Sequence, residues 1–248
     1  EPQGVAIRED GSVVVADTFN NSIRLLHPNG DVVTLAGNGE EEFRDGNGLE
    51  ARFFYPSSVS VRRDGVIVAV DSLNNSIRLV TPDGNVTTLA GDGEAGSRDG
   101  NGPEARFNNP WDVDVRDDGT AVVADTFNNS IRLVSPEGVV TTIAGDEEEG
   151  HVDGNGRDAR FREPHGVAFR EDGSVVVADT INSRIRLVSP DGYVTTLEGD
   201  NPEDRFKHPQ SISVRDDGTM VVADTGRSAI RLVVDPTYEG GVMTKAAR

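Results

Sequence analysis

The chain contains no cysteine, and only 5% of its 248 residues are aromatic. Without cysteine, the protein has no disulfides, no thiolate metal site and no cysteine nucleophile. Long apolar runs are missing as well, and no stretch approaches the roughly 18 residues that a membrane-spanning helix needs. These absences exclude disulfide scaffolds and proteins that cross a bilayer with helices.

Basic residues are also scarce. The chain has 24 Lys and Arg residues against 43 Asp and Glu residues, which gives a formal net charge of -19. A field of this sign repels phosphate backbones and anionic lipid head groups. We therefore expect neither nucleic acid nor a membrane as a partner, and we expect a protein or a small molecule instead.

What the sequence does contain is a repeat. The motif "VVADT", or a near copy, recurs at regular intervals, and each copy carries an acid: Asp17, Asp71, Asp125, Asp179 and Asp224. Around each acid lie four short strand-like runs, separated by Gly, Pro, Asn and Asp. This pattern is typical of a four-stranded antiparallel meander.

The Gly, Pro, Asn and Asp residues between the strand-like runs predict the turns. An Asp-Gly pair such as Asp10-Gly11 suits a tight hairpin between the first two strands, because glycine accepts a positive φ. In "ADTFNNS" we expect the Asp and Asn side chains to bond nearby backbone and to close a wider turn. An acid present in every repeat is expected to be structural, and the Arg of "SIRL" is expected to pair with acids on a neighbouring blade.

Five such sheets, with no helix-length amphipathic segments between them, hide both faces when they pack as blades around an axis. We predict an all-β β-propeller with five blades of four antiparallel strands each; a six-bladed ring with a missing blade is the alternative. Residues 1–248 are expected to form a single domain. Its repeats are expected at approximately 1–52, 53–106, 107–160, 161–205 and 206–248.

The motifs "VVADTFNNSIRLV", "VTTLAG" and "DGNGPEARFNNP" resemble NHL-repeat β-propellers, particularly long-loop bacterial and plant-type members. The resemblance covers all five repeats and implies the propeller fold. It does not select a function, because the family includes protein-interaction and RNA-binding propellers, extracellular ligand-binding domains and a zinc-dependent amidating lyase.

A comparison between repeats points to a binding site where the first strand of each blade begins. Residues that serve the fold should recur there, whereas residues that serve a ligand differ. The position after the Pro that recurs in each repeat varies between glutamine, serine, tryptophan and histidine: Gln3, Ser57, Trp111, His165 and Gln210. Asp112 and Asp114 stand where other repeats have Gly, Ser or Ala. The long acidic connections between blades are expected to build up this face.

In this hypothesis, Trp111 supplies a flat apolar wall, while His165, Gln3 and Gln210 donate or accept orienting hydrogen bonds. Asp112 and Asp114 add negative charge, which suits a small polar or cationic ligand. The alternative explanation is sequence drift among hydrated residues in a channel wall.

A second set of candidates lies in the connections "RDGNGLEARF", "RDGNGPEARF" and "VDGNGRDARF". Their oxygen ligands at alternating positions resemble part of a calcium loop: Asp45, Asn47, Asp99, Asn101, Asp153 and Asn155. The same residues also suit turns and the cap of a short helical turn. His165 and His208 are weaker candidates for zinc, which needs three protein ligands in a catalytic site.

The sequence thus favours a non-enzymatic propeller that binds a protein or a small polar or cationic ligand on its loop-bearing face and channel mouth. No cofactor is expected. The alternative is a hydrolase or lyase with a site at the channel mouth, dependent on a divalent cation such as calcium or zinc.

Overall fold

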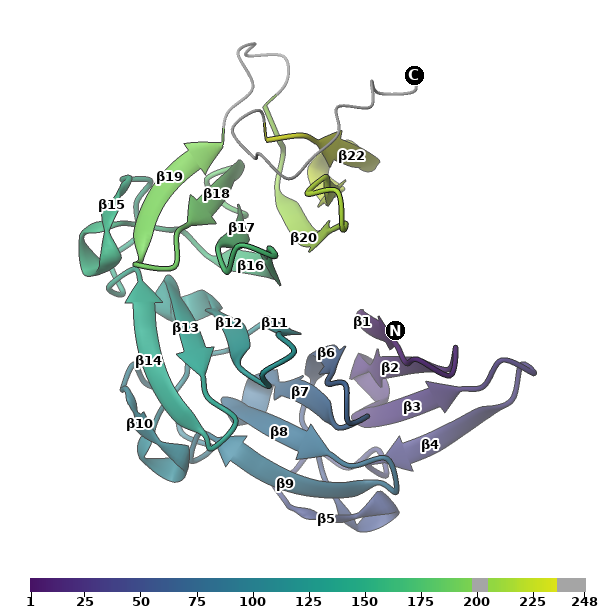
Figure 1. Cartoon of the computed structure of the whole chain (residues 1–248). Helices are drawn as coiled ribbons and strands as arrows, with labels where there is room; N and C mark the ends of the chain where they lie inside the picture. The colour runs from purple at the N-terminus through teal and green to yellow at the C-terminus, as the bar shows by residue number, and fades with distance from the viewer. Residues whose placement is uncertain (198–204, 236–248) are drawn as a thin grey trace. The chain divides into compact units, whose positions relative to one another are not determined.

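The computed structural model describes residues 1–197 and 205–235 (Figure 1). These residues form five antiparallel sheets, the blades of a β-propeller, and they contain short 3-10 turns but no α-helix. The predicted fold class is confirmed. The fourth strand expected for the last repeat falls on residues 236–248, which lie outside the described residues.

The strands of each blade are as follows. Blade 1 has β1 Gly4–Ile7, β2 Val13–Asp17, β3 Ser22–Leu26 and β4 Val32–Ala36. Blade 2 has β5 Gly46–Asn47, β6 Pro56–Val61, β7 Ile67–Asp71, β8 Ser76–Val80 and β9 Asn85–Ala90. Blade 3 has β10 Gly100–Asn101, β11 Asp112–Val115, β12 Ala121–Asp125, β13 Ser130–Val134 and β14 Val139–Ala144. Blade 4 has β15 Gly154–Asn155, β16 Pro164–Phe169, β17 Val175–Asp179, β18 Arg184–Val188 and β19 Tyr193–Leu197. Blade 5 has β20 Pro209–Val214, β21 Met220–Asp224 and β22 Ala229–Val233.

The chain divides into two compact units. The first comprises Glu1–Asn128 and Arg132–Thr141, and the second comprises Asn129–Ile131 and Thr142–Arg248. Within the first unit, separate apolar clusters fill the space between blades 1 and 2 and between blades 2 and 3. Within the second unit, a cluster joins blades 4 and 5. The core of this protein is therefore a series of layers between neighbouring sheets, made mostly of Val, Ile and Ala.

The first hairpin of each blade forms as the Asp-Gly pairs predict. In blade 1, the N–H of Gly11 donates to the carbonyl of Arg8 at 3.0 Å, and Gly11 has a φ of 79°. The side chain of Asp10 accepts the N–H of Ser12 at 2.8 Å. A residue with a β-carbon is strained at this φ, which is why glycine recurs at the turn.

The long connections lie elsewhere than we expected. The Gly-Asn pair of each connection forms a fifth strand on the outer edge of the blade that follows, so that β5 pairs with β9, β10 with β14 and β15 with β19. Figure 1 shows β5 along the outer edge of blade 2. Gly46 and Asn47 pair with the beginning of β9, whereas the connection enters at the other end of the blade. The middle of each connection therefore covers a blade edge, and the expectation that it builds up the binding face is wrong for this part.

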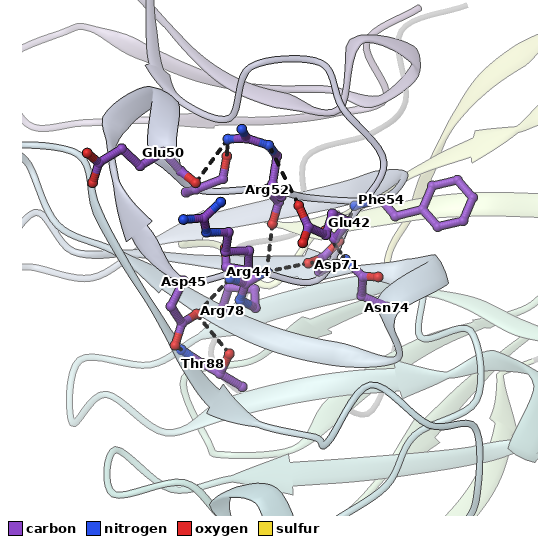
Figure 2. A network of polar contacts seen from close by, with 11 residues as sticks. Glu42, Arg44, Asp45, Glu50, Arg52, Phe54, Asp71, Asn74, Arg78 and Thr88 are labelled. Carbon is purple, nitrogen blue, oxygen red and sulfur yellow. Dashed lines mark hydrogen bonds and ion pairs between the residues drawn. The ribbon is translucent and has the colours of Figure 1, made fainter.

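A buried arginine on the third strand fastens each connection to its blade. Arg78 of β8 is fully buried. Its Nη1 donates to Oδ2 of Asp71 at 2.5 Å and to the Arg52 carbonyl at 3.1 Å (Figure 2). Its Nη2 donates to Oδ1 of Asp45 at 2.7 Å and to the Arg44 carbonyl at 2.9 Å. The guanidinium thus binds the acid of its own blade and the connection at once.

Aromatic residues of the connection enclose the same guanidinium. The rings of Phe43 and Phe53 both lie with their centroids 5.1 Å from Cζ of Arg78. Cation–π attraction of this kind strengthens when the cation is desolvated. Phe53 is itself fully buried, so the connection contributes apolar surface to the core between blades 1 and 2.

The arrangement repeats in blades 3 and 4. Arg132 binds Asp125 at 2.6 Å and Asp99 at 2.7 Å. Arg186 binds Asp179 at 2.8 Å and Asp153 at 2.7 Å. The sequence-based expectation of a structural arginine is confirmed, but its partners are the acid of its own blade and an acid of the connection, not acids of a neighbouring blade.

The repeated acid binds both the turn after the second strand and the backbone that leads into the first strand of its blade. Oδ1 of Asp71 accepts the backbone N–H of Phe54, just before the first strand of blade 2, at 2.7 Å. Oδ2 accepts Nδ2 of Asn74 at 2.9 Å in addition to Arg78. Burial raises the pKa of Asp71 to about 6, against the opposing effect of Arg78 and of these hydrogen bonds. The carboxylate therefore remains ionised at neutral pH.

The asparagine that follows the turn links adjacent blades. Asn21 has a left-handed φ of 46°, and its Oδ1 accepts the backbone N–H of Tyr55 at the start of blade 2 at 2.8 Å. Asn75 does the same for Asn109 at 2.9 Å. Within the turn, the preceding asparagine, such as Asn74, binds the acid of its own blade as expected, and the link from Asn21 and Asn75 to the next blade is a further role that the sequence did not indicate.

Replacing Asp71 with alanine should cost more stability than replacing Asp17. Loss of Asp71 leaves Arg78 buried with one carboxylate fewer, and breaking such a pair costs about 3–5 kcal/mol. Asp17 pairs with an Arg24 that is partly exposed, so its removal should cost about 1–2 kcal/mol. Urea denaturation of Asp71→Ala and Asp17→Ala measures both free energies of unfolding, and equal losses would contradict this account.

Candidate functional site

The first strands of blades 1, 2 and 3 pack side by side in the first unit. A β-carbon added at Gly4 of β1 would lie 2.6 Å from Cα of Ser58 on β6, so only glycine allows this approach. On the other side of β6, Oγ of Ser58 donates to Oδ1 of Asp112 at 2.5 Å. The candidate residues of this unit therefore stand on adjoining strands, as the sequence comparison predicts.

The two candidate acids are held by serines of the neighbouring strand. Besides the Ser58–Asp112 bond, Oγ of Ser60 donates to Oδ1 of Asp114 at 3.3 Å. Oδ1 of Asp114 also accepts the backbone N–H of Val115 at 2.9 Å. The polar residues that replace Gly and Ala on β6 and β11 thus fit one another across the two blades. Both carboxylates are fixed in position and remain partly accessible to solvent.

Ser57 occupies a structural place in this arrangement. Its Oγ donates to the Trp111 carbonyl at 2.5 Å and accepts the hydroxyl of Ser72 at 2.6 Å. The residue is buried, so its hydroxyl fixes the backbone that carries Trp111.

Three aromatic side chains form a contiguous row at the start of these strands, and we call Phe19, Tyr55 and Trp111 the aromatic row. The rings of Tyr55 and Trp111 have centroids 6.1 Å apart and are tilted by 49°. Phe19 meets Tyr55 edge to face at 5.3 Å. Nε2 of Gln3 donates to the Tyr55 hydroxyl at 3.0 Å, so the predicted Gln3 and Trp111 come together through a residue that we did not predict.

Local backbone geometry places Tyr55. It has a φ of 59°, and its N–H is bound by Asn21. The corresponding residues of the later repeats, Asn109, Glu163 and His208, also have positive φ. Because this position varies between repeats, the comparison that singled out Trp111 would also have found Tyr55 if it had begun one residue before the Pro.

Further apolar side chains are exposed on the same turns of the first unit. Phe19, Leu73 and Phe127 occupy the same position of the turn after the second strand, and all three are exposed. The N–H of Leu73 donates to the Phe54 carbonyl, and the N–H of Phe127 donates to the Asn108 carbonyl. These bonds place the turns beside the entries to the first strands, at the same end of the blades as the aromatic row.

The remaining candidates lie in the second unit. His165 stands on β16 and is partly buried, whereas Gln210 on β20 is exposed. Burial lowers the pKa of His165 to about 4, so its imidazole is neutral at pH 7. His208 is exposed, has a φ of 51°, and its backbone N–H donates to Oγ of Ser183 at 3.4 Å.

The candidate metal ligands of the connections have structural contacts. Oδ1 of Asp45 accepts a hydrogen bond from the Thr88 hydroxyl at 3.0 Å in addition to the one from Arg78. Asp153 makes the same contact with Thr196 at 2.8 Å. The neighbouring asparagines, Asn47, Asn101 and Asn155, directly precede 3-10 turns at Gly48–Glu50, Gly102–Glu104 and Gly156–Asp158.

The acids of the connections therefore bind protein groups in this structure. Among residues 1–197 and 205–235, no group of three His, Asp or Glu side chains is placed to hold a metal ion. The described part of the chain also contains no helix with the length and apolarity needed to cross a bilayer.

Comparison with known proteins identifies the repeat. A family model described as "NHL repeat" matches residues 161–186, the segment that runs from Phe161, shortly before β16, to Arg186 of β18. Protein SUPPRESSOR OF QUENCHING 1, chloroplastic, from Arabidopsis thaliana is 31% identical over 180 residues, which cover 66% of this chain and 17% of the relative. NHL repeat-containing protein 2 from Bos taurus is 33% identical over 180 residues, which cover 64% of this chain and 24% of the relative.

The chain belongs to the NHL-repeat β-propellers. It spans between 17% and 24% of the length of these two curated relatives, so the activities of the whole relatives do not transfer to it.

Solved structures similar to this NHL propeller agree with its fold. An auxiliary nutrient binding protein from Bacteroides thetaiotaomicron superposes with a TM-score of 0.72 at 15% identity, covering 93% of this chain and 58% of the other. A streptogramin B lyase superposes with a TM-score of 0.62 at 14% identity, covering 90% and 61%. At these identities the likeness concerns the fold alone, and the two neighbours, one binding protein and one enzyme, show how differently the fold is used.

The neutral state of His165 predicts a pH-dependent difference in stability. The pKa of His165 falls from 6.5 to about 4 on folding. Between pH 6.5 and pH 4, the unfolded chain therefore binds a proton at this histidine, whereas the folded NHL propeller does not. The free energy of unfolding is therefore unaffected by this histidine above pH 6.5 and decreases as the pH falls from 6.5 toward 4. Compared with the wild type, His165→Gln should become relatively more stable over this range.

Thermal melts of the wild type and of His165→Gln, recorded at several pH values from 7 downward, measure this difference. His151→Gln changes an exposed histidine of a connection and serves as the matched control. Melting temperatures of wild type and His165→Gln that fall in parallel would show that burial of this imidazole does not affect stability.

Proposed function

We propose that this NHL propeller is a binding module that holds a protein or a small polar or cationic ligand against the aromatic row. The observation that carries the proposal is the contact of three aromatic rings at the end of the blades where the first strands begin. Aromatic side chains lose little rotamer freedom on binding and dominate the energetics of many interfaces.

The position of the row supports a role in recognition. Phe19 is exposed, and its ring contacts only the edge of Tyr55 among the aromatic residues of the row. Leu73 and Phe127 extend the exposed apolar surface onto the neighbouring turns. Exposed apolar groups that gather on one part of a surface mark interaction sites more often than scattered ones do.

The charge beside the row favours a cationic group in the ligand. Asp112 and Asp114 stand on β11, directly after Trp111, and the serines of β6 hold them in place. The face of an indole ring attracts cations, and nearby carboxylates add to that attraction. The formal charge of -19 acts in the same direction at longer range.

A hydrolase or lyase remains the alternative, and it has less support. A metal-dependent reaction needs a set of converging ligands, and the described residues bring together no group of three. The fold likeness to a streptogramin B lyase concerns architecture and carries no residue of its site to this chain.

Because Trp111 is the only tryptophan of the chain, its fluorescence reports directly on the proposed site. A ligand or partner that binds the aromatic row should change the intensity or wavelength of this emission. A screen of cationic and aromatic small molecules and of peptides by tryptophan fluorescence would identify such ligands.

Substitutions in the row should then weaken binding of any ligand found in this way. Tyr55→Ala removes the central ring, and we expect the dissociation constant to rise about tenfold or more, as for other aromatic anchors. Isothermal titration calorimetry measures the change, and Tyr193→Ala, which removes an exposed tyrosine from β19, is the matched control. If ligands bind without changing Trp111 emission and Tyr55→Ala binds them equally well, the site lies elsewhere.

A further inference from the structure

An arginine directly after the last apolar residue of the first strand recurs at the same position of every repeat. In each case its backbone N–H donates to the carbonyl of the residue four places later, across the first hairpin. Three of these arginines bind a carboxylate through their side chains: Arg62 binds Asp64 at 3.0 Å, Arg116 binds Asp118 at 3.4 Å and Arg170 binds Asp235 at 2.8 Å. The fold thus pairs this cation in blades 2, 3 and 4.

Arg8, the equivalent residue of blade 1, has a different environment. Its side chain is partly buried, and among residues 1–197 and 205–235 its Nε and Nη2 have no hydrogen-bond partner. Asp10, the counterpart of Asp64, accepts the N–H of Ser12 at 2.8 Å and its hydroxyl at 2.6 Å. These bonds lower the pKa of Asp10 more than the charge of Arg8 does. The Arg8 guanidinium is therefore partly desolvated without the charge-assisted bond that its equivalents make.

A hollow of about 360 Å³ lies beside Arg8, between the first hairpins of blades 1 and 2. Ile7, Val61 and Pro82 give it apolar walls, and Arg8 and Arg62 are among its polar lining residues. All of them belong to the first compact unit. A hollow of this volume is large enough for a small molecule. It lies at the opposite end of the first strands from the aromatic row.

Blades 4 and 5 show which chemical group fits against this arginine. Nη1 of Arg170 donates to Oδ2 of Asp235 at 2.8 Å, and the two side chains are only 2% and 1% exposed. Asp235 stands two residues after β22. Two residues after β8, the equivalent strand of blade 2, stands Pro82, which has no carboxylate and lines the hollow. A carboxylate in the hollow would therefore meet Arg8 as Asp235 meets Arg170.

We infer that this hollow binds a small organic acid, whose carboxylate pairs with the guanidinium of Arg8. Nε and Nη2 share one edge of the guanidinium, and such an edge can donate two parallel hydrogen bonds to a carboxylate. A rotation of the Arg8 side chain toward the hollow brings this edge to the acid and pairs a charge that no carboxylate of the protein binds. The apolar walls bury the hydrocarbon part of the acid.

The charges around the hollow favour a single carboxylate over a polyanion. Glu9, Asp10 and Asp64 also line the hollow, and Arg62 compensates only Asp64 among them. The formal charge of -19 further repels anions with several charges. We therefore expect monocarboxylates to bind more tightly than inorganic phosphate.

Titration of the full chain with benzoate, followed by ¹H–¹⁵N NMR, tests the proposal. Benzoate should shift the Nε–H signal of Arg8 and the backbone amides of Arg8 and Gly65, which lie beside the hollow. Benzamide, the neutral analogue of the same shape, should shift them far less at the same concentration. Inorganic phosphate and an acetylated Ala-Phe dipeptide with a free carboxyl end are the further probes.

Substitutions check the location. Arg8→Gln removes the cation and should raise the dissociation constant of benzoate about tenfold or more, because a charge-assisted pair is lost. Pro82→Asp supplies a carboxylate from the chain itself and should weaken benzoate by a similar factor. Arg157→Gln changes an exposed arginine of the connection before blade 4 and is the matched control. Circular dichroism confirms that each variant is folded, and Pro82→Asp keeps the test valid if Arg8→Gln is not.

The proposal is overturned if benzoate and benzamide cause equal shifts, or if Arg8→Gln and Pro82→Asp bind benzoate as tightly as the wild type. Tighter binding of phosphate would assign the hollow to polyanions, and tighter binding of the dipeptide would assign it to the end of a polypeptide. Either result also overturns the assignment to a small organic acid. The outcome is independent of the ligand proposed for the aromatic row, because the two sites share no residue.

Discussion

The buried arginine of the third strand is the interaction on which the rest of the structure depends. Its guanidinium joins two parts of the chain: the acid at the end of the second strand, and the preceding connection, which supplies an acid and two backbone carbonyls. A buried cation is costly unless carboxylates and hydrogen bonds compensate its charge, and the connection supplies one carboxylate and two carbonyls to this guanidinium. The position of each blade entry follows from these contacts.

This constraint fixes the backbone that leads into the first strand of each blade, whereas the side chains at the start of these strands vary between repeats. The acid that binds the arginine also binds the backbone N–H just before the first strand, and an asparagine from the previous blade binds the next N–H. The residues that follow are fixed in backbone but not in side chain. Trp111 and His165 therefore differ at equivalent positions on the same backbone, which is the condition for a binding site on a repeated scaffold.

Much of the blade structure could be derived from the sequence, because residues that the fold requires recur at the same position of each repeat. An acid recurs at the same position of every repeat, and this recurrence correctly indicated a structural role, as Asp71 and Asp125 show. The Asp-Gly pairs correctly placed the first hairpins. The partners of Arg78 could not be derived, since they are separated by up to 34 residues and come together only when the connection crosses the blade edge. The aromatic contact of Tyr55 with Trp111 was missed for the same reason.

The sequence by itself determined the four meander strands of most blades, the hairpin turns and the number of blades, because these depend on local preferences for alternating apolar residues, glycine and proline. The edge strands β5, β10 and β15 were decided by the tertiary structure. Only the tertiary structure decided that the acids of the connections bind arginine and threonine, and that Asp112 and Asp114 are held by serines of β6. The physical reason is that a carboxylate has the same local sequence signature whether it binds an ion, a guanidinium or water. Its partner is chosen by the side chains that packing brings within hydrogen-bonding distance.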